Sequence, residues 1–283
     1  MKTLLSFGHG YSAQALTRLL LPLGWRVIGT TRSADKAAAL AASGVEPLIF
    51  PGDAVDAALD DATHLLISAG PDAEGDPVLR AVGDQIRASA AQFAWAGYLS
   101  TTGVYGDHKG GWVDEDTALT PSTRRGQWRV AAETAWREIP DLPLHIFRLA
   151  GIYGPGRGPF AKVRAGTARR IIKPDQVFSR IHVEDIAQIV LASIHQPAPG
   201  AVYNLCDDDP APPQDVIAHA AALLGLPVPP AEDFETAEMT PMARSFYAES
   251  KRVRNDRIKD DLGVTLLYPN YRDGLAALLA RDG

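Results

Sequence analysis

The chain has 283 residues, of which 46% are hydrophobic and 22% are charged, and its formal net charge at pH 7 is -6. This composition is typical of a globular protein with a sizeable core. The acidic balance argues against nucleic acid as the main partner, because nucleic-acid-binding proteins usually carry a basic excess. The single cysteine, Cys206, excludes an internal disulfide and a multi-cysteine zinc site. Together with the lack of a long apolar run, it leads us to expect a cytoplasmic protein without a membrane partner.

The first half of the chain alternates short apolar runs with helical patterns. Strands are predicted at residues 3–7, 26–30, 45–50, 64–68, 98–101 and 144–149, and helices at residues 12–21, 34–42, 78–95 and 121–138. Short strands separated by helices indicate βαβ units, and therefore a doubly wound parallel sheet with helices on both faces. We predict an α/β fold in which residues 1–150 form a Rossmann-type dinucleotide-binding domain.

The second half is less regular. Helices are predicted at residues 184–195, 213–224, 256–262 and 271–280, with a short strand at residues 201–205. We expect residues 151–283 to form a smaller substrate-side region, with some elements returning to the Rossmann core. This region is expected at the carboxyl edge of the sheet, where ligands of open α/β folds bind.

A glycine-rich turn follows the first predicted strand and directly precedes a helix. It has the pattern G-x-G-x-x-A and consists of Gly8, His9, Gly10, Tyr11, Ser12 and Ala13. The first glycine permits a tight turn, the second lets the backbone approach a pyrophosphate, and the small third residue lets helix and strand pack closely. The helix N-terminus adds free N–H groups and positive partial charge. The pattern predicts a dinucleotide site, and a purely structural turn is the alternative.

The end of the second predicted strand indicates which dinucleotide is preferred. An NAD-binding protein usually has an acidic residue there to hold the ribose 2′-OH. This chain has Thr31, Arg32 and Ser33 instead. Arg32 can form charge-assisted hydrogen bonds with a 2′-phosphate, and its neighbours supply hydroxyl groups. NADP(H) is therefore favoured over NAD(H), and a surface arginine at the start of a helix is the alternative.

Four further segments occur in order along the chain. They are T-T-G-V-Y-G at residues 101–106, R-L-A-G-I-Y-G-P-G at 148–156, I-H-V-E-D-I-A at 181–187 and Y-N-L at 203–205. Taken together, the chain resembles the extended short-chain dehydrogenase/reductase family, of the NAD-dependent epimerase/dehydratase type. The resemblance implies a homodimer formed through helices 78–95 and 121–138.

The resemblance also implies roles for individual residues. Gly52 and Asp53 match a G-D pair whose aspartate contacts adenine, and Ser68, Ala69 and Gly70 match a segment beside the cofactor ribose. Thr101 falls on the position of the catalytic serine or threonine.

The chain departs from the family at the Y-x-x-x-K pair, where it has Arg125 and Arg129. No tyrosine occurs between Tyr105 and Tyr153, so a shift in alignment does not restore one. Arginine stays protonated and cannot exchange a proton near neutral pH, as general acid–base catalysis requires. Arg129 can still donate to a ribose hydroxyl. The pattern is similar to that of atypical members of the superfamily, and the usual proton relay is missing.

Other side chains are candidates for catalysis and substrate binding. Tyr105 is either a substitute acid that acts with Thr101 or a packing residue. Tyr153 and His182 belong to family motifs on the substrate side. Arginines are dense around the Y-G-P-G loop and can line a pocket for an anionic substrate, such as a nucleotide-linked sugar or a phosphate ester, or form a solvated face. They are Arg157, Arg164, Arg169, Arg170 and Arg180, of which Arg157 and Arg180 are the predicted substrate contacts. No residues show the spacing of a metal site.

Two functions stay open. The first is an NADP(H)-binding epimerase/dehydratase- or reductase-like enzyme that acts on a small polar substrate, with an anionic substrate as one alternative. The second is a non-catalytic NADP(H)-binding regulatory or sensor protein. The first is favoured, because the loss of one proton donor does not abolish hydride transfer to substrates that need little help with the proton.

Overall fold

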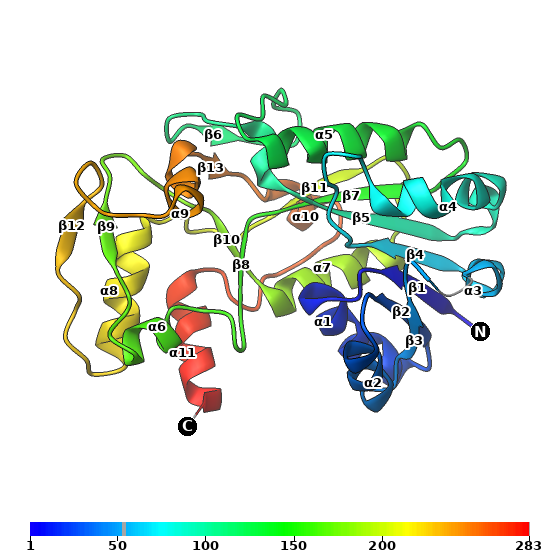
Figure 1. Cartoon of the computed structure of the whole chain (residues 1–283), viewed down its shortest axis with the longest axis horizontal. Coiled ribbons are helices and arrows are strands. Elements are labelled where there is room, and N and C mark those ends of the chain that lie inside the picture. Colours follow the sequence, from blue (N-terminus) through cyan, green and yellow to red (C-terminus); the bar gives the residue numbers. More distant parts are fainter. Residues whose placement is uncertain (53–54, 283) are drawn as a thin grey trace.

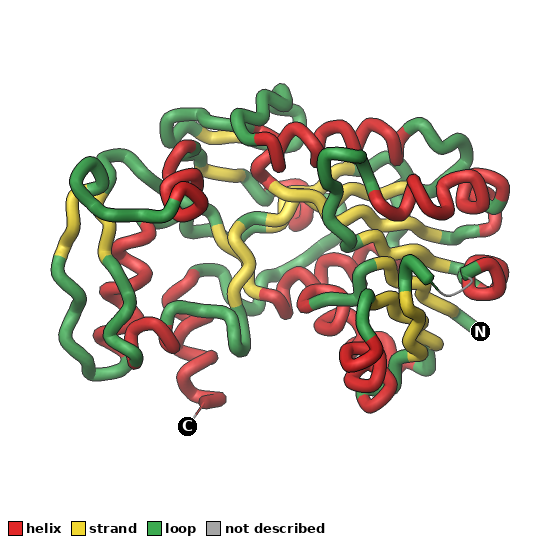
Figure 2. Tube along the Cα trace, in the orientation of Figure 1, coloured by secondary structure: helices red, strands yellow, loops and turns green. Residues whose placement is uncertain are grey.

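The computed structural model describes residues 1–52 and 55–282. Its centre is a parallel sheet of seven strands in the order β11-β7-β5-β4-β1-β2-β3 (Figures 1 and 2). The strands are β1 (Thr3–Phe7), β2 (Arg26–Thr31), β3 (Glu46–Ile49), β4 (His64–Ile67), β5 (Trp95–Thr101), β7 (Leu144–Leu149) and β11 (Val202–Leu205). The chain winds outward in both directions from β1, so the predicted doubly wound α/β fold is confirmed.

Helices cover both faces of the sheet (Figure 1). One face packs on α1 (Tyr11–Leu20), α2 (Ala34–Ala42) and α7 (Val183–His195), and the other on α3 (Asp56–Asp61), α4 (Pro77–Ala88) and α5 (Arg124–Arg137). Each face of the sheet has its own hydrophobic core, and alternate strand residues point into one or the other. Leu4 packs in the core under α1, α2 and α7, and Leu5 in the core under α3, α4 and α5. This alternation is the two-residue period of a strand that is buried on both faces.

A second region lies beyond the carboxyl ends of the strands (Figure 1). Strand β8 (Gly151–Tyr153) pairs with β10 (Arg180–His182), and β9 (Arg170–Ile172) pairs with β12 (Ala231–Asp233). The helices here are α6 (Phe160–Arg164), α8 (Pro213–Leu223), α9 (Pro241–Ser245) and α11 (Tyr271–Asp282). Its own small core includes Tyr153, Phe160 and Leu275. In contrast, α7, β11 and α10 (Asp256–Asp260) pack into the Rossmann layers.

Two further short strands join distant parts of the chain. Strand β6 (Trp112–Val113) follows the 3-10 turn η3 (Thr102–Tyr105), and it pairs in parallel with β13 (Arg252–Val253). A segment from the end of the second region is thereby fixed beside the loop after β5. In the described part of the chain, no helix is long and apolar enough to cross a bilayer.

The largest difference from the predicted elements lies between α4 and β5. The helix predicted at residues 78–95 ends at Ala88, and the strand predicted at residues 98–101 already begins at Trp95. The alanine-rich sequence favours a helix, but pairing of Trp95 with His64 in β4 and of Ala96 with Leu144 in β7 overrides that preference. Helix α5 begins at Arg124 rather than residue 121, because Thr123 caps it by accepting from the Gly126 N–H at 3.1 Å.

Candidate functional site

The turn between β1 and α1 has the geometry expected of a phosphate-binding loop. Gly8 has φ +76°, and a Cβ there would lie 2.7 Å from the backbone nitrogen of Ala69. The Ser68 hydroxyl donates to the Gly8 carbonyl at 2.5 Å, which ties the turn to the end of β4. At Gly10 the nearest atom to an added Cβ is 3.7 Å away. Gly8 is therefore required by packing, whereas Gly10 keeps the space in front of the helix open.

The N-terminus of α1 presents unpaired donors. The N–H groups of residues 11, 12 and 13 have no acceptor among the described residues, and the first intrahelical bond is from Gln14 to Gly10 at 2.9 Å. Gly10 provides no side-chain cap, and the first turn contains no acidic residue. The positive end of the helix dipole is therefore available to an anion. Ala13 is fully buried, as expected for the small third position.

His9 points into the core rather than toward a ligand. Its ring occupies space that Gly29 leaves free, since a Cβ on Gly29 would lie 2.7 Å from His9 Cγ. Its Nε2 is 3.2 Å from the Thr17 hydroxyl. Burial lowers the pKa of His9 to about 4, so the imidazole is neutral near pH 7. The side chain of His9 thus shapes the turn, and only its backbone lies on the predicted cofactor side.

The end of β2 lies beside this turn. The His9 N–H donates to the Thr30 carbonyl at 2.9 Å. Arg32 is exposed and has no ion pair or hydrogen bond within residues 1–52 and 55–282, while Thr31 and Ser33 are half-buried. Ser33 also caps α2. The guanidinium at this edge is consequently free to bind a phosphate. Gly52 follows β3, and the predicted adenine contact Asp53 lies outside the described residues.

Arg129 lies where the family has its lysine. Its Nη1 donates to the Tyr98 hydroxyl at 3.0 Å and to the Leu99 carbonyl at 2.8 Å, both on β5. A Cβ on Gly70 would be 3.4 Å from Nη2, so the guanidinium borders the segment after β4 that was predicted to flank the ribose. Arg125 is exposed. The structure thus brings Arg129 to the same edge as residues 68–70, and it leaves Arg125 at the surface.

Thr101 and Tyr105, the predicted catalytic pair, have different surroundings. Thr101 ends β5, is half-buried, and accepts from the Gly103 N–H at 3.1 Å. Tyr105 is fully buried, donates to Asn204 Oδ1 at 2.7 Å and accepts from Arg148 at 3.0 Å. Burial raises the pKa of Tyr105 to about 12. This geometry argues against a catalytic role for Tyr105 and favours the packing alternative.

A buried ion pair behind these residues was not predicted. Glu133 on α5 is fully buried and accepts from Arg148 Nη2 at 2.9 Å and from the Ser100 hydroxyl at 2.6 Å. Arg148 lies on β7, so the pair fixes α5 against two strands. The sequence signal was a charged residue within the apolar run 144–149, which is costly to bury without a partner.

The predicted substrate contacts Tyr153, Arg180 and His182 lie together on paired strands, His182 opposite Tyr153. His182 is fully buried, packs edge-on against the Tyr153 ring at 5.1 Å, and accepts from the Glu184 N–H at 3.2 Å. Arg180 donates to the backbone carbonyls of Phe178 and Ala211 at 2.8 and 3.0 Å. These contacts hold the second region together. His182 Nε2 has no hydrogen-bond partner among the described residues, but the side chain is fully buried.

The predicted arginine cluster is dispersed. Arg169 pairs with Glu232, and Arg170 donates to the Pro229 carbonyl at 3.1 Å. Arg157 instead lies over the ring of Tyr11, 5.7 Å from its centroid. The Tyr11 hydroxyl donates to the Pro155 carbonyl at 2.9 Å, which brings the Y-G-P-G loop to the start of α1. An anionic substrate pocket lined by all these arginines is therefore not supported.

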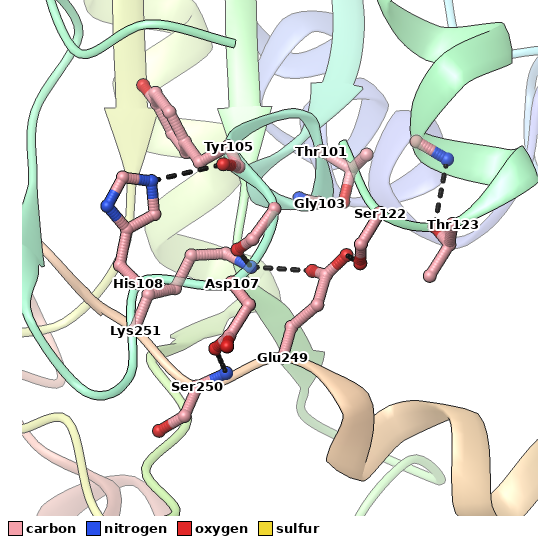
Figure 3. A network of polar contacts seen from close by, with 12 residues as sticks. Thr101, Gly103, Tyr105, Asp107, His108, Ser122, Thr123, Glu249, Ser250 and Lys251 are labelled. Atoms are coloured by element: carbon pink, nitrogen blue, oxygen red, sulfur yellow. Dashed lines mark hydrogen bonds and ion pairs between the residues drawn. The ribbon is translucent and has the colours of Figure 1, made fainter. Parts of the chain in front are cut away.

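A second polar network lies after β5 and includes residues 249–251, which directly precede β13 (Figure 3). Its members Ser122, Glu249 and Lys251 were not identified from the sequence. They are connected by hydrogen bonds of 2.6 and 2.7 Å. Among the residues with described positions, no group of three or more His, Cys, Asp or Glu side chains is arranged to hold a metal ion.

Comparisons with known proteins agree with this architecture. No protein-family model matches the chain. Protein YeeZ of Escherichia coli (strain K12) is 30% identical over 285 residues, which cover 95% of this chain and 97% of YeeZ. A functionally unknown conserved protein from Silicibacter pomeroyi has a solved structure with 67% identity and a TM-score of 0.96, covering 100% of this chain and 99% of that one.

A more distant structure has a cofactor. The human epimerase family protein SDR39U1 (isoform 2), solved with NADPH, has a TM-score of 0.79 at 17% identity, covering 98% of this chain and 99% of that one. The parallel sheet, the glycine turn after its first strand and the near full-length match to YeeZ all indicate the same family. The chain belongs to the extended short-chain dehydrogenase/reductase superfamily, of the NAD-dependent epimerase/dehydratase type.

Proposed function

We propose that the protein binds NADP(H) and uses it to oxidise or reduce a small polar substrate at the carboxyl edge of β5. One observation carries this proposal: three N–H groups at the N-terminus of α1 have no acceptor among the described residues, and they face the space that Gly10 leaves open. The NADPH in the structure of SDR39U1 supports it by analogy of fold.

The residues present fit the parts of this cofactor. The N–H groups of residues 11–13 would hold the pyrophosphate, and the free guanidinium of Arg32 would hold the 2′-phosphate. Arg129, fixed by Tyr98 and Leu99, would donate to a ribose hydroxyl. Bound nicotinamide supplies or accepts a hydride. Thr101, whose hydroxyl proton is not used in its bond to Gly103, would donate to the substrate oxygen.

A small polar substrate is preferred to a strongly anionic one. Arg169 is neutralised by Glu232, and Arg180 is committed to backbone carbonyls. The polar network after η3 instead has the hydroxyl of Ser122 and a charge-balanced Glu249–Lys251 pair. Such a surface suits a substrate with hydroxyl or carbonyl groups better than a phosphate ester.

A second candidate function is a non-catalytic NADP(H)-dependent regulator. It rests on Arg125 and Arg129, which occupy the positions of the family's tyrosine and lysine and cannot exchange protons. Both candidates bind the cofactor, but only the enzyme consumes it.

Calorimetric titration with NADPH and NADH tests the cofactor. We expect wild type to bind NADPH more tightly, and Arg32→Asp to weaken NADPH about 10- to 100-fold while NADH changes little, because only NADPH has the 2′-phosphate. Arg87→Asp is the matched control, since it makes the same charge change on an exposed arginine of α4. Failure of wild type to bind either dinucleotide would refute the proposal.

Turnover separates the two candidates. NADPH is mixed with aldehydes, ketones and 2-keto acids, and NADP⁺ with the matching alcohols. Turnover that Thr101→Ala lowers without changing the Kd of NADPH identifies an enzyme. Tight binding without turnover favours the regulator.

A further inference from the structure

The segment before β13 is fixed against the loop that follows η3. The Ser250 N–H donates to Asp107 Oδ1 at 2.8 Å, and the Ser250 carbonyl accepts from His108 and Gly110 at 3.1 and 2.9 Å. Figure 3 shows Asp107 and Ser250 in contact, with Glu249 and Lys251 on either side of Ser250 in the chain. These bonds place residues 249 and 251 next to the end of β5, although they lie more than a hundred residues away in sequence.

A shielded ion pair lies at this junction. Lys251 Nζ donates to Glu249 Oε2 at 2.7 Å and to the Gly106 carbonyl at 2.6 Å, and the two side chains are only 10% and 13% exposed. A Cβ on Gly106, which has φ +75°, would overlap the carbonyl of Thr120, so the position of this loop is constrained. Removing two charges from water is costly, and replacing a buried ion pair by apolar residues is often neutral or stabilising. The pair is therefore weak evidence of a role in stability alone.

The other oxygen of Glu249 accepts a hydrogen bond from a serine two residues before α5. Ser122 Oγ donates to Glu249 Oε1 at 2.6 Å (Figure 3). Because the serine proton is directed at the carboxylate, the oxygen lone pairs are left for another partner. Ser122 is exposed, in contrast to Glu249 and Lys251. The Glu249 carboxylate is thus largely shielded from solvent, and the exposed Ser122 hydroxyl is hydrogen-bonded to it.

Ser122 lies three positions before Arg125, the residue at the position of the family's absent tyrosine. A Cβ on Gly126 would be 2.8 Å from the Gly103 carbonyl, so the first turn of α5 packs directly on η3. Thr101, the last residue of β5, accepts from the Gly103 N–H of η3. The position of the absent tyrosine, Arg125, belongs to this same first turn. Ser122 is therefore two residues before the helical turn that packs on η3, the 3-10 turn that directly follows Thr101.

We propose that Ser122 is the acid/base at the substrate oxygen, that Glu249 exchanges the proton with Ser122, and that Lys251 positions Glu249. This inference rests on the proposed NADP(H)-dependent function. In the oxidative direction, the substrate O–H bond breaks and its proton passes to Ser122 Oγ, while the serine proton passes to Glu249 Oε1. A bound NADP⁺ would accept the electron pair of the substrate C–H bond as hydride, which leaves a C=O bond on the substrate. Reduction by NADPH reverses each transfer.

The test uses full-length protein with saturating NADPH and a panel of aldehydes, ketones and 2-keto acids. We expect Ser122→Ala and Glu249→Gln each to lower kcat about 100-fold or more, as loss of general acid–base catalysis does, with the Kd of NADPH unchanged. Ser122→Thr keeps the hydroxyl and should keep most of the activity. Glu235→Gln, an exposed carboxylate of the second region, is the control for removal of one charge.

Chemical rescue separates proton transfer from a structural role. Formate should restore part of the kcat of Glu249→Ala, because a free carboxylate can exchange the proton with Ser122. Ser122 is exposed, so Ser122→Ala remains informative even if variants of Glu249 fail to fold.

Three outcomes overturn the inference. The first is a Ser122→Ala variant with wild-type kcat, and the second is one that loses NADPH binding in proportion to activity. The third is a wild type that binds NADPH without turning over any compound of the panel. The first two leave the proposed function intact, the third leaves only NADP(H) binding, and a wild type that binds no dinucleotide removes the proposed function and this inference together.

Discussion

Two glycines in the same turn should respond to alanine in opposite ways. Gly8 has φ +76°, and its added methyl group would lie 2.7 Å from Ala69 N and 2.9 Å from Ala69 Cα, which are backbone atoms that cannot rotate away. A positive φ costs an L-residue about 1–2 kcal/mol. Overpacking adds roughly 1–3 kcal/mol. Gly8→Ala is therefore expected to lower the free energy of unfolding by about 2–5 kcal/mol.

Gly10→Ala should leave stability nearly unchanged. Its φ of −96° is available to any residue, and the nearest atom to the new methyl group is 3.7 Å away. We expect a stability change within about 0.5 kcal/mol. The methyl group would, however, stand in front of the unpaired N–H groups where the pyrophosphate has to approach. NADPH affinity should fall about tenfold or more, equivalent to roughly 1.4 kcal/mol.

The assay is urea unfolding of both variants together with calorimetric titration of NADPH. Thermal unfolding gives a second readout, because 1 kcal/mol shifts Tm by roughly 2–4 °C in a protein of this size class. A stable Gly8→Ala variant would refute the close contact with the end of β4. Unchanged NADPH binding by Gly10→Ala would refute the assignment of the pyrophosphate to this turn, whatever its stability.

Three further predictions concern buried side chains that can carry a charge. Glu133→Ala leaves Arg148 buried without its carboxylate, so urea unfolding should show a loss of about 3–5 kcal/mol, and a loss below about 1 kcal/mol would contradict the ion pair's role. His9 and His182 have pKa values of about 4 in the folded protein, against 6.5 for an ordinary histidine. Their contribution to stability should be full above pH 6.5 and fall toward pH 4, because only unfolded chains take up protons in this range. Urea unfolding midpoints measured across this range check the prediction, and His9→Asn should make them less dependent on pH. Asp207 is the reverse case: burial raises its pKa from 3.8 to about 8, so its contribution decreases as pH rises through that range, and Asp207→Asn should gain stability relative to wild type at the alkaline end. An unchanged difference between that variant and wild type at all pH values would contradict it.

The Rossmann half could be predicted from the sequence because its signals are local. The turn from Gly8 to Ala13 is contiguous, and each predicted strand of the sheet is a short apolar run bounded by polar or small residues. The prediction failed at α4 and β5, where an alanine-rich run favours a helix and only pairing with β4 and β7 decides for a strand. Several elements of the second region have only two to five residues, too few to show a period.

The candidate site was likewise predictable only where its residues belong to a local motif. Residues supplied by a motif, such as Gly10 and Thr101, were identified, because their role follows from neighbours in the chain. The Ser122–Glu249 and Lys251–Gly106 bonds span 127 and 145 positions. No local sequence pattern identifies Glu249 or Lys251 as site residues, because they come close to Ser122 and Gly106 only when β13 pairs with β6. Tyr105 was ambiguous for a related reason: its burial depends on Asn204 and Arg148, which lie on two other strands.

The tyrosine and lysine of typical relatives combine two tasks in one short motif: they hold the ribose and move a proton. We propose that in this chain the two tasks fall to different residues. Arg129 would keep the first, since its guanidinium is fixed to Tyr98 and Leu99 and borders Gly70. It cannot perform the second, because a permanent cation neither gives nor takes a proton. A hydroxyl coupled to a shielded carboxylate meets that need without a tyrosine, and Ser122 with Glu249 is such a pair at the start of the same helix.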